Sequence, residues 1–367
     1  MKRAGIIGIG KLGLCFALNL ERAGYEVYGV DVSEEYVNQL NTKAFSSPEP
    51  EVSELLAHSK SFFAGTDIST LLTKGVEDIF IMVATPSLAD GTYDHSQIER
   101  ITEELILKGK LEKTVHLYVG CTTMPGYCNL LAAKLQQYNY TVSYNPEFIA
   151  QGSIIHDQQY PDQVLIGEGD EEAGNRLEEI YRNLVKNNPM FCRMDRLSAE
   201  ITKLATNCFL TTKISFANSI GDLAVKSGAD HEKILKAIGA DSRIGSKYLN
   251  YGFGFGGPCF PRDNRALGAF AKKQDYPLLI SEATDDVNKM HLEFQLQHYL
   301  EKYAANEPIK FDYVSYKKGS VIIEESQQLA LAVRLAKAGR KVIVNDRAEV
   351  KKEVEKKYPG LFEFSKL

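Results

Sequence analysis

The twelve residues from Gly252 to Asp263, which read GFGFGGPCFPRD, have the composition of a loop that could do chemistry. Glycines at this density let the backbone approach a ligand closely. The loop presents Cys259, with Arg262 three positions further on and Asp263 four positions on. A thiol presented in this way favours a nucleophilic cysteine. The alternative is a small buried hydrophobic residue in a glycine-rich turn, which is what most free cysteines are.

A second group of residues, near the N-terminus, predicts nucleotide binding. Gly8, Gly10 and Gly13 form GxGxxG, and Asp31 follows Gly13 by 18 residues. The flanking sequence predicts a strand at 4–7, a helix that ends near Ala23, and a strand at 27–30. In such a unit the glycines and the helix N-terminus bind a pyrophosphate. The carboxylate of Asp31 should bind ribose hydroxyls and repel a 2′-phosphate, so NAD is predicted rather than NADP.

The composition is that of a soluble enzyme. The chain has 367 residues, 44% of them hydrophobic, and a formal net charge of −5, which argues against a nucleic-acid or membrane-surface partner. The sequence contains no apolar run of transmembrane length. Its six cysteines form no CxxC pair and show no zinc spacing, so we predict no metal site and a reducing, cytoplasmic location.

Strand and helix patterns alternate along the chain, which predicts a largely parallel sheet with helices on both faces. Further strands are predicted at 78–83, 115–120 and 141–144, and a long helix at 197–226. A linker is expected at 303–311, followed by a β-α-β unit with a helix at 329–338 and a strand at 341–345. We therefore predict an α/β protein: a Rossmann-type domain (1–195), a helical central dimerisation domain (196–302) and a shortened C-terminal α/β domain (303–367).

The ordered motifs resemble the UDP-glucose/GDP-mannose dehydrogenase family, and within it most closely the shorter bacterial UDP-glucose 6-dehydrogenases. Besides the glycine motif, the resemblance rests on the segments VATPSLADGTYD, NPEFIAQGSIIHD, EITKLATNCFLTTKISFAN and DSRIGSKYLNYGFGFGGPCFPRD. It covers residues 3–280 well and the last 60 poorly. This family oxidises the C6 alcohol of a nucleotide sugar to a carboxylate, with two NAD and one active-site thiol, so the resemblance implies that activity.

The resemblance implies six catalytic residues: Cys259, Lys203, Asn207, Asp263, Glu147 and Thr123. Cys259 matches the family's nucleophile. Lys203 and Asn207 are four residues apart on one predicted helix, so their side chains project from one face and could donate to a developing alkoxide. Asp263 resembles the acid that orients a water molecule with the lysine. Glu147 and Thr123 match the acid and the hydroxyl that assist hydrolysis of a thioester.

Binding residues also follow from the resemblance. The cofactor set is Gly8, Ile9, Gly10, Lys11, Leu12, Gly13, Asp31, Thr85 and Thr123. The substrate set is Phe148, Ile149, Ala150, Gln151, Lys203, Asn207, Arg243, Tyr248, Asn250, Gly256 and Lys317. The sequence departs from the family pattern at four positions: Gln151 in place of glutamate, Gln163 in place of arginine, Pro258 in place of a small or aromatic residue, and Glu324 in place of arginine.

Three functions fit these observations. The favoured one is a four-electron dehydrogenase of a nucleotide sugar, most simply of UDP-glucose. The alternatives are a two-electron dehydrogenase of the β-hydroxyacid type and a catalytically inactive nucleotide-sugar sensor. The predicted helix 197–226 has apolar residues on more than one face, which indicates burial in a homodimer, with Arg243 near the partner's site.

Overall fold

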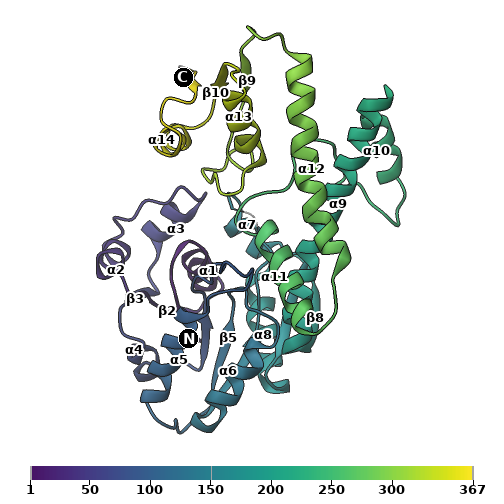
Figure 1. The fold of residues 1–367 in the computed structure, drawn as a ribbon. Coiled ribbons are helices and arrows are strands. Elements are labelled where there is room, and N and C mark those ends of the chain that lie inside the picture. Colours follow the sequence, from purple (N-terminus) through teal and green to yellow (C-terminus); the bar gives the residue numbers. More distant parts are fainter. Residues whose placement is uncertain (1, 150, 366–367) are drawn as a thin grey trace. The chain divides into compact units, whose positions relative to one another are not determined.

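The computed structural model describes residues 2–149 and 151–365 and divides the chain into two compact units (Figure 1). The N-terminal unit ends at Lys203, and the C-terminal unit begins at Leu204.

The elements have the following bounds. The strands are Arg3–Ile7 (β1), Glu26–Val30 (β2), Phe62–Gly65 (β3), Asp78–Ile81 (β4), Val115–Val119 (β5), Tyr140–Tyr144 (β6), Gln163–Glu168 (β7), Met190–Asp195 (β8), Ile309–Phe311 (β9), Val342–Val344 (β10) and Glu363–Phe364 (β11). The helices are Lys11–Arg22 (α1), Glu34–Asn41 (α2), Val52–His58 (α3), Ser69–Thr73 (α4), Ser96–Leu107 (α5), Tyr127–Leu135 (α6), Gln136–Tyr138 (η1), Ile154–Gln159 (α7), Glu171–Leu184 (α8), Arg196–Ser227 (α9), His231–Gly239 (α10), Phe260–Lys273 (α11), Leu279–Lys302 (α12), Gln327–Lys337 (α13) and Ala348–Lys357 (α14).

The N-terminal unit is built on an eight-stranded sheet of order β3-β2-β1-β4-β5-β6-β7-β8. Neighbouring strands are parallel except β6 and β7, which are antiparallel and share the single register pair Tyr144↔Gly167. The last residue of β1, Ile7, is in register with Val30 of β2 and with Ile81 of β4. The carboxyl ends of these three strands therefore meet at one edge of the sheet, where open α/β sheets bind ligands.

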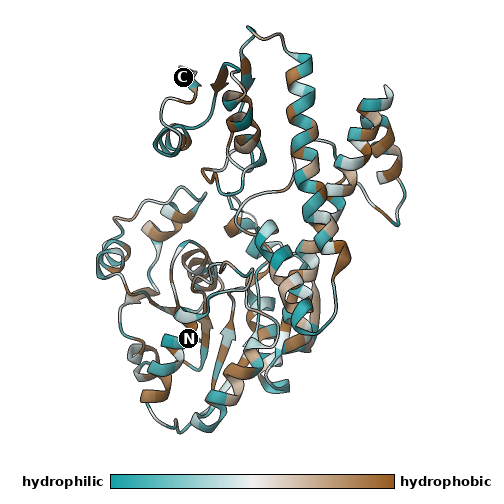
Figure 2. Ribbon diagram, in the orientation of Figure 1, coloured by the Kyte–Doolittle hydropathy of each residue, from teal (hydrophilic) through white to brown (hydrophobic). Residues whose placement is uncertain are grey.

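Alternate residues of each strand enter two different cores, as the period of two in a strand requires. Ile6, Phe80 and Tyr118 pack with helices α1, α2, α3, α7 and α8 on one face. Their neighbours Ile7 and Ile79 pack on the other face with α4, α5, α6 and the start of α9. Figure 2 colours many residues of these strands as hydrophobic. The sheet is thus covered on both faces, as the alternation of elements predicted.

The C-terminal unit combines long helices with a small parallel sheet. Helix α9 has 32 residues and continues from the N-terminal unit, and α12 has 24. The sheet has the order β11-β10-β9. Buried residues of β9, α13, β10 and α14 form its core, to which Leu292 of α12 contributes, while α14 is largely hydrophilic on its other side (Figure 2).

The predicted α/β fold with a helical central region is confirmed, and the predicted helix 197–226 matches α9 within one residue at each end. The expected linker at 303–311 is shorter than predicted. Strand β9 lies inside the stretch 303–311, which was expected to be a linker. The short segment pairs with β10, from Val342↔Ile309 to Val344↔Phe311, and this distant partner makes it a strand. In the part of the chain described, every helix is too short or too polar to cross a membrane.

Candidate active site

The glycine motif forms a tight turn between β1 and α1. Gly8 has φ of +90°, a conformation that L-residues rarely adopt. A Cβ on Gly13 would lie 2.0 Å from the carbonyl oxygen of Gly8, so only glycine fits there. A Cβ on Gly10 would meet no protein atom within 4 Å, which leaves room for a ligand beside the backbone. The turn therefore has the shape expected of a pyrophosphate loop.

The start of α1 is suited to an anion. Its N-cap residue, Gly10, makes no side-chain capping bond, and the first turn contains no acidic residue. The first N–H groups and the positive end of the helix dipole are therefore not neutralised by the protein at this point. Asp31 follows β2, and its Oδ1 accepts a hydrogen bond from Ser33 N at 3.1 Å. These features fit a dinucleotide such as NAD.

Four other residues belong to the predicted cofactor set. The side chain of Ile9 is fully buried in the core, so it could contribute only its backbone. Thr85 is buried, and its hydroxyl donates to Thr122 O at 2.7 Å. Lys11 donates from Nζ to Oε1 of Gln151 at 3.0 Å, which connects the glycine turn to the predicted substrate segment. Leu12, the next residue of α1, is partly buried.

Glu49 binds the backbone that follows the predicted substrate segment 148–151. The carboxylate of Glu49 is buried and accepts N–H bonds from Gly152 at 2.9 and 3.0 Å and from Ile154 at 2.9 Å. Phe148 and Ile149 are partly buried, and Gln151 receives Lys11, as described above. Ala150 lies outside the described residues. The sequence analysis missed Glu49, because nothing in its local sequence shows which backbone groups it binds.

Lys203 and Glu147 are neighbours in the N-terminal unit. Nζ of Lys203 donates to the backbone oxygen of Glu147 at 2.7 Å and lies 4.4 Å from the ring centroid of Phe148. Burial raises the pKa of the Glu147 carboxyl to about 7, and the nearby Lys203 charge limits the rise. Lys203 is only 7% exposed, so it is not a solvated surface lysine. A carboxyl group that titrates near neutral pH suits a general base.

Thr123 is fully buried and bound by an acid that the sequence analysis missed. Its hydroxyl donates to Oε1 of Glu200 at 2.8 Å. The same carboxylate accepts the N–H of Gly126 at 2.6 Å and that of Cys128 at 2.9 Å, and so binds the start of α6. Three donors on one buried carboxylate fix this loop. The available signal was an acid three residues before Lys203 on the same helix face.

His95 supports the same loop from another side. Its Nε2 accepts the N–H of Met124 at 3.2 Å, and its ring stacks on Tyr127 with 3.8 Å between centroids. Burial lowers the pKa of His95 to about 4, so the ring is neutral at physiological pH and can accept this bond. The loop after β5 is therefore bound by Glu200 and His95, which are distant from it in sequence.

In the C-terminal unit, Cys259 is the N-cap residue of α11 and makes no capping bond with its side chain. Among the six cysteines, which are all thiols, Cys259 is exposed, Cys192 is half-buried and the other four are buried. Burial raises the pKa of Cys15 and of Cys208 to about 12, so these thiols stay protonated. A thiol at the positive end of a helix dipole is in a setting typical of reactive cysteines.

Asp263 and Asn207 form a buried pair beneath this cysteine. Nδ2 of Asn207 donates to Oδ2 of Asp263 at 2.6 Å, and both residues are at most 7% exposed. Asp263 N donates to the carbonyl oxygen of Cys259 at 2.8 Å, which ties the acid to the first turn of α11. Arg262 lies beside the same carboxylate, with 3.5 Å between Nε and Oδ1. The three predicted catalytic residues of this unit are thus neighbours.

The glycine-rich loop packs against the segment that follows β9. Gly257 N donates to the carbonyl oxygen of Glu324 at 3.0 Å. A Cβ on Gly256 would lie 2.3 Å from the carbonyl oxygen of Glu325, so the close approach requires glycine. Tyr316 lies nearby, and its pKa is raised by burial and by Cys259. The departure at Glu324 therefore concerns a residue whose backbone supports the cysteine loop.

The remaining predicted substrate residues are on the surface of the C-terminal unit. Arg243 is exposed and pairs with Asp241, with Nη2–Oδ2 at 2.7 Å. Tyr248 is 44% exposed with φ of 63°, and Asn250 and Lys317 are exposed. Of the other departures, Gln163 accepts a bond from the Cys192 thiol, while nothing in the structure explains Pro258.

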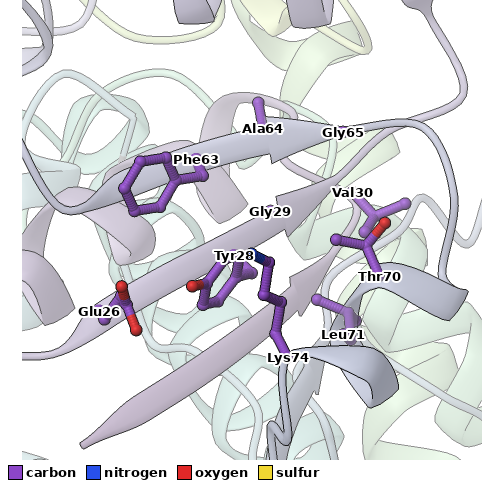
Figure 3. A pocket seen from close by; sticks show the side chains of 10 residues that line it. All are labelled: Glu26, Tyr28, Gly29, Val30, Phe63, Ala64, Gly65, Thr70, Leu71 and Lys74. Carbon is purple, nitrogen blue, oxygen red and sulfur yellow. The ribbon is translucent and has the colours of Figure 1, made fainter. Parts of the chain in front are cut away.

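A pocket of about 320 Å³ lies elsewhere, over β2 and β3 beside α4 (Figure 3). The rings of Tyr28 and Phe63 stack in its wall at 5.5 Å, and Lys74 extends over Tyr28. None of the predicted site residues lines this pocket. Among the residues described, no cluster of His, Cys, Asp and Glu could hold a metal ion.

Comparison with known proteins gives two family matches that together cover most of the chain. Residues 2–185 match the NAD binding domain of the UDP-glucose/GDP-mannose dehydrogenase family, and residues 197–290 match its central domain. The UDP-glucose 6-dehydrogenase of Rickettsia bellii is 33% identical over 77% of this chain, which spans 66% of the relative's length. That of Pseudomonas aeruginosa is 30% identical over 94% of this chain and 78% of its own length. A solved structure of a UDP-glucose dehydrogenase from Pyrobaculum islandicum superposes with a TM-score of 0.89 at 28% identity, covering all of this chain and 86% of that one.

Proposed function

The chain belongs to the UDP-glucose/GDP-mannose dehydrogenase family, and we propose that it oxidises the C6 alcohol of a nucleotide sugar to a carboxylate. The family match over residues 2–185 is to an NAD binding domain, which supports NAD as the cofactor and the predicted class of NAD-dependent dehydrogenase. UDP-glucose is the proposed substrate, because the similar curated proteins are named for it. The chain spans 66% to 78% of those two relatives, and its own activity is therefore put forward as a proposal.

The observation that carries the proposal is Cys259. Cys259 is the exposed cysteine and the N-cap residue of α11. Asp263, in the first turn of the same helix, forms a buried hydrogen bond with Asn207. A two-electron alcohol dehydrogenase has no use for such a thiol. The second oxidation, from aldehyde to acid, does need a group that converts the aldehyde into a tetrahedral adduct.

The proposed reaction has three stages. First, the C6 alcohol would give up a proton to a base and a hydride, which leaves the aldehyde. The thiolate of Cys259 would then add to the aldehyde carbon, and the resulting thiohemiacetal anion would give up a second hydride and become a thioester. Water finally attacks the thioester, which releases the carboxylate and returns the thiol. NAD supplies hydride acceptance in both oxidations, and the protein supplies the nucleophile, the acid–base groups and the oxyanion donors.

Lys203 and Asn207 have the chemistry of oxyanion donors. An ammonium and a carboxamide N–H can each donate to the oxygen on C6 as it gains charge. Both are nearly buried, and donors shielded from water stabilise charge more strongly than exposed ones. We assign Asp263 the role of orienting Asn207 through the 2.6 Å bond between them, and of holding water for hydrolysis.

Glu147 is the proposed base for hydrolysis of the thioester. Its pKa of about 7 means that a large fraction is ionised at neutral pH and can accept a proton from water. Thr123 is proposed to support this step by fixing the loop after β5. Because its hydroxyl proton is directed to Glu200, its oxygen can act only as an acceptor towards any other group.

The stoichiometry of the reaction tests this proposal. The protein is incubated with excess NAD and a limiting amount of UDP-glucose, and the NADH formed per sugar consumed is counted. We expect two. One NADH would support the two-electron dehydrogenase, and none with any of UDP-glucose, UDP-N-acetylhexosamines and GDP-mannose would support an inactive sensor. Two NADH with a sugar other than UDP-glucose would keep the reaction and change the substrate.

A homodimer is proposed as the active form. Phe209, Phe216 and Leu223 recur every seven residues on α9 and are 66%, 48% and 63% exposed. Large apolar side chains in a row on one exposed helix face are typical of a protein–protein contact. Light scattering at micromolar concentration should give twice the monomer mass, and Phe216→Glu should give a monomer. We also keep the predicted cytoplasmic location, which rests on the six thiols.

A further inference from the structure

We propose that Gln158, oriented by Asn19, is a positioning residue that holds the carboxyl group of Glu147 for thioester hydrolysis. The inference rests on the proposed function of Glu147. It concerns two buried amides that neither the sequence analysis nor the family comparison singled out. Asn19 lies on α1, Gln158 lies on α7, and both are 2% exposed.

The two amides form a chain that ends at Glu147. Nδ2 of Asn19 donates to Oε1 of Gln158 at 2.9 Å. Nε2 of Gln158 in turn donates to Oε1 of Glu147 at 3.4 Å. The opposite end of Asn19 is also satisfied, since its Oδ1 accepts from Nε2 of Gln159 at 2.7 Å.

A backbone carbonyl fixes the direction of the whole chain. Nδ2 of Asn19 also donates to the carbonyl oxygen of Ile155 at 3.2 Å, and a carbonyl can only accept. The Asn19 amide must therefore present nitrogen to Ile155 and to Gln158. Gln158 must therefore accept with its oxygen, which leaves its NH₂ group to donate to Glu147. Reversing either amide would place two donors or two acceptors in contact inside the protein.

The chain gives the two oxygens of Glu147 different roles. Oε1 receives an N–H, so a proton taken from water is expected on Oε2. A hydrogen bond donated to a carboxylate also favours the charged form, and the Gln158 donation lowers the pKa of Glu147 against the larger effect of burial. Gln158 thereby keeps the base ionised near neutral pH as well as oriented.

Other groups near Glu147 affect its titration and stay unchanged in the test. Lys203 on α9 lowers the pKa of Glu147, and Asp157 on α7 raises it. Cys15 on α1 and Tyr181 on α8 also face this carboxyl group, and burial keeps both of them protonated, because it raises their pKa values.

The test compares pH profiles of turnover in the whole 367-residue chain. Gln158→Met keeps the length of the side chain and removes the donor. We expect the limb in which turnover rises with pH to move upward by about one pH unit, because the base needs a higher pH to ionise. Gln158→Glu changes the side chain least and should move the limb in the same direction, since an added carboxylate opposes ionisation of Glu147.

Gln159→Met is the matched control. Gln159 is the next residue of the same helix, is 5% exposed, and donates to Asn19 without a hydrogen bond to Glu147 among those described. Asn19 keeps its orientation in this variant, because Ile155 still fixes it. The control should lose thermal stability much as Gln158→Met does, with its pH limb unmoved. A merely structural role for Gln158 would give two variants with the same profile.

A second readout does not depend on turnover. The pKa of Glu147 is raised from 4.5 to about 7 in the folded protein, so folding favours its neutral form. The stability that this gives is present below about pH 4.5 and is lost as pH rises through 7. The Tm of the wild type relative to Glu147→Gln should therefore fall across this range. In the Gln158→Met background the same fall should extend about one pH unit higher.

The two readouts separate the possible failures. If the wild type forms no NADH from any nucleotide sugar, the proposed function is wrong, while the Tm titration still decides whether Gln158 controls the ionisation of Glu147. If the enzyme is active and neither Gln158 variant moves the limb or the Tm titration, the positioning role is overturned. An equal movement in Gln159→Met would overturn it as well.

Discussion

Two β-α-β units of this chain have the same connectivity, but they differ in how the start of the helix is capped and in what binds the acid after the second strand. In the first, β1-α1-β2, helix α1 begins at Gly10 without a side-chain cap, and Asp31 after β2 accepts an N–H from its near neighbour Ser33. In the second, β9-α13-β10, the hydroxyl of Ser326 caps α13 by accepting from Leu329 N at 3.2 Å. Asp346 after β10 accepts the N–H groups of Val314 and Ser315 at 2.8 and 3.0 Å.

The difference shows that the fold alone does not make a nucleotide site. Both units have parallel strands joined through a helix, and both place an acid after the second strand. The second unit uses its own serine and backbone to satisfy the helix start and the acid. In the first unit no side chain caps the helix start, and the acid accepts only the N–H of Ser33 among the hydrogen bonds described. Helix α11 also starts without a side-chain cap, at Cys259, but its first turn contains the acid Asp263.

The largest expected effect is at this second uncapped helix start. Cys259→Ala should lower net turnover by about 10³-fold or more, because no other group can form the thioester. NAD affinity should not change, since the glycine turn is in the other unit. Alkylation, followed by mass spectrometry, should label Cys259 first. Cys192→Ala is the control and should keep full activity; a loss there equal to that of Cys259→Ala would contradict the assignment.

Two glycine variants should distinguish the fold of the first unit from its ligand site. Gly13→Ala places a Cβ 2.0 Å from Gly8 O, and such overpacking costs about 1–3 kcal/mol. We expect both Tm and NAD affinity to fall, the latter about tenfold or more. The Cβ of Gly10→Ala would meet no protein atom within 4 Å, so this variant should keep its Tm and bind NAD more weakly. Thermal unfolding and NAD titration measure the two effects, and unchanged NAD binding in Gly10→Ala would argue against this turn as the pyrophosphate site.

Cofactor choice sharpens the role of the acid. A 2′-phosphate beside Asp31 would place like charges together, which costs several kcal/mol. The kcat/KM for NAD should therefore exceed that for NADP by on the order of 10²-fold. Asp31→Asn removes this repulsion and should bring the kcat/KM for NADP closer to that for NAD. Equal efficiency with the two cofactors in the wild type would remove Asp31 from the ribose site.

The smallest expected effect is at the capped helix. Ser326→Ala removes an N-cap, which costs about 1 kcal/mol and should lower the Tm by about 2–4 °C. NAD affinity should stay at the wild-type value, because this helix start has no ligand to lose. A calorimetric scan and a NAD titration suffice. Weakened NAD binding in this variant would show that the two β-α-β units are not as independent as the comparison implies.

Much of the fold was predictable because local pattern and final structure agree. The strands at 4–7 and 27–30 match β1 and β2 within one residue, and Gly24, with φ of +92°, follows the end of α1. Strand β9 was missed because its three residues, Ile309–Phe311, carry too little periodicity to predict a strand. Its structure depends on β10, more than 30 residues later in the chain.

The candidate site divides in the same way. Residue types and spacing indicated Cys259 and the glycine turn, and the family resemblance indicated the Lys203–Asn207 pair, which lies on a local motif. The supporting residues were not predictable locally. Glu200 binds Thr123 across 77 residues, and Asn19 binds Gln158 across 139. The only local signal for Asn19 was a polar residue at a core position of an apolar helix, and this says nothing about its partner.

The reversal of direction between β6 and β7 has a consequence for cooperativity. Six register pairs join β7 to β8, whereas β6 and β7 share only Tyr144↔Gly167. The eight-stranded sheet is therefore a six-stranded block and a two-stranded block with a weak seam between them. In a hydrogen-exchange experiment, the backbone amides of β7 and β8 should lose protection together, before those of the six-stranded block. Glu147 follows Tyr144, the β6 residue of this seam, by three residues, so the carboxyl group assigned to hydrolysis would lie at the boundary between these two expected unfolding units.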